Sequence, residues 1–86
     1  MPELCRFFGI IIRMYVDDHF PAHFHAYYNE HEILVDIYNF SIIAGSFPPK
    51  AMGLVMEWAT MHKHELLENW ELARGKKHTY KIEPLQ

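Results

Sequence analysis

Hydrophobic residues alternate with polar ones in the first half of the chain and recur with a helical period in the second half. Residues 7–16 are rich in β-branched and aromatic side chains, which is typical of a strand. Alternation predicts a core face on this strand made of Phe8, Ile10, Ile12, Met14 and Val16. Arg13 and Tyr15 fall on the opposite face.

Three more strands are predicted at residues 23–28, 33–38 and 40–44. In the first of these, one face carries His23, His25 and Tyr27, and the other carries Phe24, Ala26 and Tyr28. The connections between the predicted strands are short, which indicates an antiparallel sheet.

From about Pro49 to Arg74 the hydrophobic period changes to that of a helix, and Gly75 is a natural stop. The apolar stripe of this helix is Ala51, Val55, Trp58, Ala59, His62, Leu66, Trp70 and Ala73. The pattern predicts an α+β fold, with a small antiparallel four-stranded sheet (β-β-β-β-α) and one long C-terminal helix packed on one face. Met52, Met56 and Leu67 lie outside the stripe, so we expect a homodimer or another protein partner.

The length of 86 residues predicts a single domain, residues 1–86. No apolar run is long enough to cross a bilayer and no signal peptide is visible, so we expect a cytoplasmic protein without membrane contact. The net charge of −3 gives no general attraction to nucleic acid. A basic run after the helix, with Arg74, Lys76, Lys77 and Lys81, is either a solvated tail or a contact for phosphates.

Seven histidines are many for a chain of this length, and three of them lie close together in the sequence. Two imidazoles on one strand face, His23 and His25, are a common way to bind a transition metal. His19 is a candidate third ligand, and Asp17, Asp18 or Glu30 could complete the site. One hypothesis is therefore a small protein that binds a divalent metal such as Zn.

A second hypothesis needs no cofactor. His23 and His25 would move a proton of an RNA 2′-hydroxyl, and Arg13 would stabilise the phosphate. Further substrate contacts would come from Tyr15, Tyr27, Lys76 and Lys77. A third hypothesis is a structural dimer in which the histidines only occupy outward positions. The residues alone leave open whether the protein is an enzyme.

Four helix residues are expected to be structural. Trp58 and Trp70 anchor the helix on the sheet, and Glu65, three residues after His62, is placed to orient its imidazole.

The segment His19-x-Pro21-x-His23-Phe24-His25-Ala26, followed by His62-x-x-Glu65-Leu66 and Asn69-Trp70, resembles the small bacterial domain-of-unknown-function family 4160. The resemblance covers residues 3–85 and departs from the family pattern at Ala22, where a second proline is common. It implies a bacterial protein, the toxin-like half of a toxin–antitoxin-like gene pair, with an adjacent-gene partner of family 2442. It implies no reaction.

Overall fold

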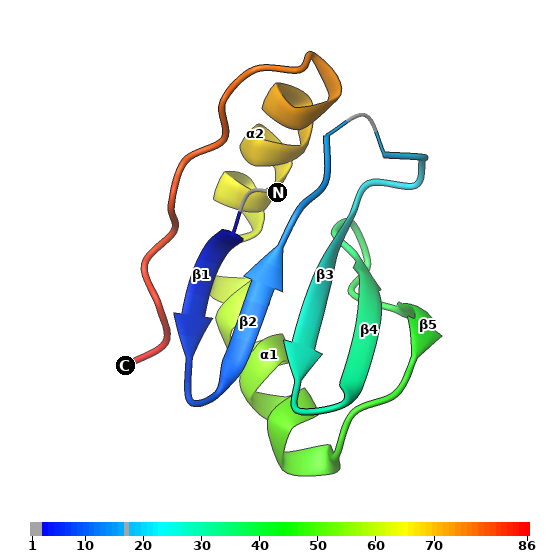
Figure 1. Ribbon diagram of the computed structural model, residues 1–86, viewed down its shortest axis with the longest axis vertical. Helices are drawn as coiled ribbons and strands as arrows, with labels where there is room; N and C mark the ends of the chain where they lie inside the picture. Colours follow the sequence, from blue (N-terminus) through cyan, green and yellow to red (C-terminus); the bar gives the residue numbers. More distant parts are fainter. Residues whose placement is uncertain (1–2, 17) are drawn as a thin grey trace.

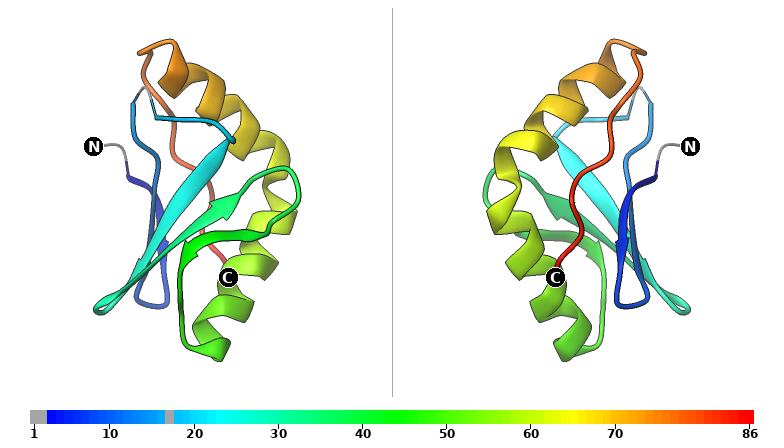
Figure 2. Two further views of the ribbon diagram at one scale, coloured as in Figure 1. Left: turned by 90° about the vertical axis from the view of Figure 1, so that its right-hand side faces the viewer. Right: turned by 90° about the vertical axis from the view of Figure 1, so that its left-hand side faces the viewer.

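The computed structural model describes residues 3–16 and 18–86 and has the expected α+β architecture. Five antiparallel strands lie in the sheet in chain order (Figure 1). They are β1 (Glu3–Phe7), β2 (Ile10–Arg13), β3 (His23–Tyr28), β4 (His31–Asp36) and β5 (Ile42–Gly45). The helices α1 (Pro49–Met61) and α2 (Lys63–Arg74) cover one face of the sheet (Figure 2). Neither helix has the length and apolar character that a membrane span requires.

Of the first predicted strand, residues 7–16, only Ile10–Arg13 forms a strand of its own, β2; Phe7 ends the preceding strand β1, and residues 14–16 lie outside the strands. β1 and β2 form a hairpin whose turn residues, Phe8 and Gly9, have φ values of 49° and 81°. Positive φ at both turn positions matches the right-handed twist of the flanking strands, so it favours a tight hairpin. Phe8 lies in this turn and is exposed, and Val16, also predicted to be in the core, is exposed after the end of β2; Ile10, Ile12 and Met14 are buried as expected. The sheet therefore has five strands instead of four.

The predicted strand over residues 23–28 is confirmed with the same boundaries, and the next two are found with shifted ends. Phe24 pairs with Val35 and Ala26 with Ile33 across β3 and β4. All four side chains are completely buried, which is the result expected for alternation on a sheet with one covered face.

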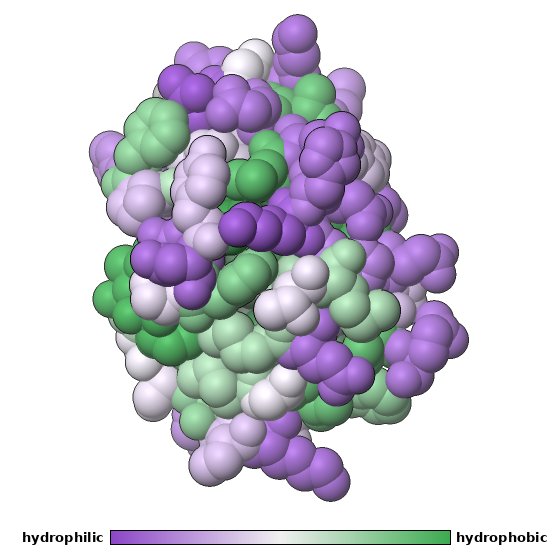
Figure 3. All heavy atoms as spheres, turned by 180° about the vertical axis from the view of Figure 1, so that it is seen from behind, coloured by the Kyte–Doolittle hydropathy of each residue, from purple (hydrophilic) through white to green (hydrophobic). Residues whose placement is uncertain are grey.

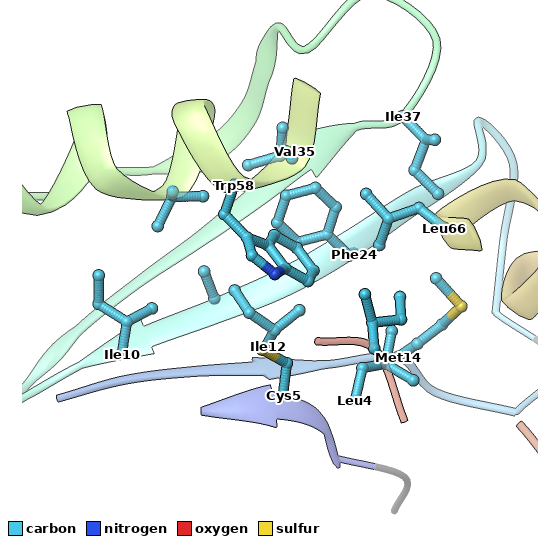
Figure 4. Close-up of a cluster of buried hydrophobic side chains, with 14 of the residues drawn as sticks. Leu4, Cys5, Ile10, Ile12, Met14, Phe24, Val35, Ile37, Trp58 and Leu66 are labelled. Atoms are coloured by element: carbon cyan, nitrogen blue, oxygen red, sulfur yellow. The ribbon is translucent and has the colours of Figure 1, made fainter. Parts of the chain in front are cut away.

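The core lies between the sheet and the helices, with Trp58 of α1 at its centre (Figure 4). The Trp58 ring lies 5.6 Å from that of Phe7 and 6.0 Å from that of Phe24, measured between centroids. Apart from His62, whose side chain is 13% exposed, the predicted helix stripe is buried throughout.

The long predicted helix is interrupted at His62. This residue has φ −122° and ψ 25°, outside the helical range, and its N–H donates to the Ala59 carbonyl, a 3₁₀-type contact.

The two helices differ in surface character. Seen from behind (Figure 3), the region over α2 is mainly hydrophilic and the region over α1 is more hydrophobic. Met52, Met56 and Leu67 are only partly buried and pack against the core.

The segment after α2 returns along the sheet beside β1 (Figure 1). The Ile82 N–H donates to the Leu4 carbonyl at 2.9 Å, and the Trp58 indole N–H donates to the Glu83 carbonyl at 2.8 Å. Ile82 itself is buried. The end of the chain is therefore part of the fold, while Lys76 and Lys77 at its beginning are exposed.

Candidate functional site

His23 and His25 lie on one face of β3, opposite Phe24 and Ala26, as the alternation predicts. Their ring centroids are 5.2 Å apart. His25 is half-buried, but His23 is only 5% exposed. His23 begins the strand, and the centroid of its ring lies 5.2 Å from that of Trp70 in α2. The His23 imidazole is thus more buried than expected for a side chain on the outer face of a sheet.

Asp18 joins the two histidines from the preceding loop. Its Oδ2 lies 3.0 Å from His23 Nε2 and 3.2 Å from His25 Nε2. One ligand atom from each of the three residues lies within 4.8 Å of the other two. The cluster places a carboxylate and two imidazoles at one point, which is a ligand set suited to a divalent metal.

His19, the expected third ligand, is exposed and stands outside this cluster. It contributes its backbone instead, because its N–H donates to Asp18 Oδ1 at 2.9 Å. Of the three carboxylates considered from the sequence, Asp18 is in the cluster, Glu30 is exposed beside His31, and Asp17 lies outside the described residues.

The other ring nitrogen of each histidine also faces an oxygen. His23 Nδ1 lies 2.7 Å from the Pro21 carbonyl, which can only accept, so Nδ1 carries a proton. His25 Nδ1 lies 3.2 Å from Glu32 Oε2. If both rings are neutral with the proton on Nδ1, both Nε2 lone pairs point at the same Asp18 oxygen. That contact is repulsive, and a cation bound between the two Nε2 atoms and Asp18 would relieve it; conversion of the rings to imidazolium ions would do so as well.

The pKa of the Asp18 carboxyl lies below its ordinary value. Partial burial acts to raise this pKa, but the His19 N–H and the two imidazoles stabilise the carboxylate and together outweigh it. Asp18 is therefore held in the ionised form, which is the form that binds a metal or an imidazolium.

Arg13, Tyr15 and Tyr27 share this face of the sheet, as predicted. The Tyr15 ring packs edge-on against His25 with centroids 4.4 Å apart, and the Tyr15 and Tyr27 hydroxyls are hydrogen-bonded. Arg13 is the direct cross-strand neighbour of His25. Burial, the Tyr15 hydroxyl and the nearby Glu32 carboxylate all raise the pKa of Tyr27, so its phenol stays protonated.

Of the residues predicted to be structural, Trp58, Glu65 and Trp70 lie in the helices, and His62 lies at the break between them. His62 Nδ1 is 2.5 Å from Glu65 Oε1, which confirms the expected contact, and the His62 ring lies 5.4 Å from that of Trp58. Trp70 is buried between Phe20 and His23.

The basic segment reaches the same end of the molecule as the loop that carries Asp18. Lys77 and Lys81 line a hollow of about 560 Å³ together with Val16, which precedes Asp18 by two residues. Lys76 is exposed and does not line this hollow.

Glu32 is the residue that sequence reasoning missed. It lies opposite Tyr27 in the β3–β4 hairpin. The signal was present, because pairing the two strands across the turn at Asn29 and Glu30 places Glu32 on the face of the histidines.

Residues 9–71 match the family model described as Domain of unknown function (DUF4160). This match includes both histidines and Asp18. Searches of curated proteins and of solved structures found no match to the chain.

Proposed function

Because the chain belongs to the DUF4160 family, whose description assigns no reaction, we propose a function from the geometry of its site: it binds a divalent transition metal through His23, His25 and Asp18. The three ligands come from one strand and the loop before it. The strand is held on its other face by the core, so two of the ligands sit on a rigid support.

The hydrogen bonds of the ring nitrogens carry this proposal. Metal-binding histidines usually donate their second N–H to a carbonyl or carboxylate, which orients the ring. His23 has the Pro21 carbonyl in this position and His25 has Glu32. Both Nε2 atoms are then left to face Asp18 Oδ2, where a divalent cation would remove the repulsion between lone pairs.

A site with three protein ligands has coordination positions left for water or substrate, unlike the closed four-ligand sites of structural zinc. Two imidazoles and one carboxylate suit zinc and ferrous iron. When bound, the metal would supply a Lewis acid and lower the pKa of a bound water. The chain's own residues would orient the imidazoles and keep Asp18 ionised.

Calorimetric titration of untagged, metal-depleted protein with zinc and with nickel tests the proposal. We expect one ion per chain, with a Kd below about 1 μM. Replacing His23 and His25 together by alanine should abolish binding. The matched control is His64→Ala with His78→Ala, which removes two histidines on exposed positions and should leave binding intact. Absence of binding to the wild-type protein would refute the proposal.

A metal-free function remains the second candidate, and one observation favours it. Both ring nitrogens of each histidine lie beside an oxygen, so Asp18 and Glu32 could also hold two imidazolium ions. With Arg13 on the same face, the site would act as an acid–base pair on RNA, as the toxin-like half of a gene pair.

Two measurements separate this candidate from the metal site. Activity on RNA should survive a chelator, and it should be lost in His25→Ala. Expression of the chain alone should inhibit growth, and coexpression of the adjacent-gene protein should restore it.

We also propose that the hydrophobic surface of α1, with Met52 and Met56, contacts a second copy or that partner. Sedimentation of the pure chain as a monomer at high concentration, together with no binding to the adjacent-gene protein, would rule this out.

A further inference from the structure

Arg13 has no role in the metal site proposed above, yet it lies directly beside it. It is opposite His25 in the β2–β3 pairing, so the two side chains project from the same face as nearest cross-strand neighbours. Its guanidinium carbon lies 5.4 Å from the centre of the Tyr27 ring.

Arg13 also differs from the other two arginines of the chain. Arg6 binds Glu3 at 2.8 Å and Arg74 binds Glu71 at 3.2 Å. Within residues 3–16 and 18–86, Arg13 has no such carboxylate partner, and its Nε is buried without a hydrogen-bond acceptor. The buried Nε is out of reach of a ligand, but a guanidinium without a carboxylate partner can bind an anion through its terminal nitrogens.

The charges around the site point the same way. Asp18 and Glu32 would together offset the two charges of a divalent metal, and Arg13 would then leave the site with one net positive charge. A tetrahedral oxyanion fits this combination. One of its oxygens can occupy an open position on the metal, and two others can accept hydrogen bonds from the planar guanidinium fork.

We infer that the ligand of this centre is a phosphate-type oxyanion, bound jointly by the metal and by Arg13; the inference rests on the proposed metal site. Arg13 is the anion anchor. The hydrogen bond between the Tyr15 and Tyr27 hydroxyls holds the Tyr27 ring in place beside the Arg13 guanidinium.

The phosphate group has two possible sources, a small phosphate compound or the backbone of a nucleic acid. The hollow lined by Lys77, Lys81 and Val16 adjoins the loop of Asp18, and its acidic lining residue, Glu3, is already paired with Arg6. In a polymer, neighbouring phosphates would contact these two lysines. A free phosphate would not need them.

The experiment uses the full chain loaded with zinc and freed of excess metal. Inorganic phosphate is titrated calorimetrically, and a single-stranded uridine oligonucleotide is titrated by fluorescence anisotropy. We expect phosphate to bind the zinc-loaded protein at least about tenfold more tightly than the metal-free protein, and about tenfold more tightly than the zinc-loaded Arg13→Gln variant. Lys50→Gln removes one positive charge from an exposed position of α1 and should bind phosphate as the wild type does.

A double variant, Lys77→Gln with Lys81→Gln, distinguishes the two possible sources of the phosphate group. If only oligonucleotide binding and its salt dependence decrease, the phosphate belongs to a nucleic acid. If neither ligand is affected, it belongs to a small compound; both results support the inference.

Zinc binding and far-UV circular dichroism are measured for every variant first. If the wild type fails to bind zinc, the proposed function fails and this inference with it. If zinc binds but phosphate affinity is equal in the wild type and Arg13→Gln, the metal site stands and the inference is wrong. Arg13→Lys, which keeps the charge and loses the fork, serves where Arg13→Gln does not fold, and it should bind phosphate more weakly than the wild type.

Discussion

The two faces of β3 differ in chemistry, although their residues alternate one by one along the same six positions. Phe24 and Ala26 on the inner face are fully buried under the helices. His25 and Tyr27 on the outer face are half-buried and make polar contacts with Glu32 and Tyr15. The comparison teaches that one strand can supply both core and site. Because core packing fixes the backbone, the imidazoles are positioned without a dedicated scaffold.

The largest expected effect concerns the inner face. Phe24→Ala should lower the free energy of unfolding by about 3–5 kcal/mol, because it leaves a cavity against Trp58. His25→Ala, one position along, should cost much less in the absence of metal. Urea unfolding of both variants measures the difference. Should Phe24→Ala not fold, Phe24→Leu gives a smaller loss with the same sign. Equal losses of unfolding free energy for Phe24→Ala and His25→Ala would show that the inner face of β3 contributes no more to stability than the outer face.

The next effect belongs to the outer face. At a free zinc concentration of 100 times its Kd, the wild-type protein should gain about 2.7 kcal/mol of stability, since only the folded state holds the ligands together. His25→Ala should gain nothing, and Phe24→Leu should keep the full gain. Thermal unfolding with and without zinc measures this. An undiminished gain in His25→Ala would place the metal elsewhere.

A smaller effect is expected at acid pH in metal-free protein. The folded-state pKa of Asp18 is lower than its ordinary value of about 3.9, so the carboxylate is favoured by folding. Its stabilisation is complete above that value and is lost as the pH falls through the lowered pKa. Asp18→Asn should therefore be less stable than the wild type near neutral pH, and the difference should shrink on acidification. A constant difference from neutral to acid pH would contradict this, and urea unfolding along the series measures it.

The smallest effect is expected at Cys5, another inner-face residue. Burial raises the pKa of its thiol to about 11, so the reactive thiolate is scarce at neutral pH. A thiol reagent should modify Cys5 only very slowly in the native protein and rapidly in urea. Mass spectrometry follows the reaction, and fast labelling of the folded protein would show that the inner face opens readily.

Much of the fold could be predicted because its signals are local. Alternation placed His25 and Tyr27 opposite Phe24 and Ala26, and the helical period identified the buried stripe around Trp58. Both signals reflect side-chain directions that the backbone sets within a few residues. The hairpin at Phe8 and Gly9 was missed because the residues on both sides of the turn are equally suited to a strand.

The site was predictable only in part, for the same physical reason. The sequence by itself determined that His23 and His25 project from one face of a strand, with Arg13 and Tyr15 on the same side of the sheet. Only the tertiary structure decided that Asp18, and not His19, turns its side chain toward them, because a loop's path depends on what it packs against. The burial of Ile82 beside Leu4 was likewise decided by contacts between distant segments, which no local pattern records.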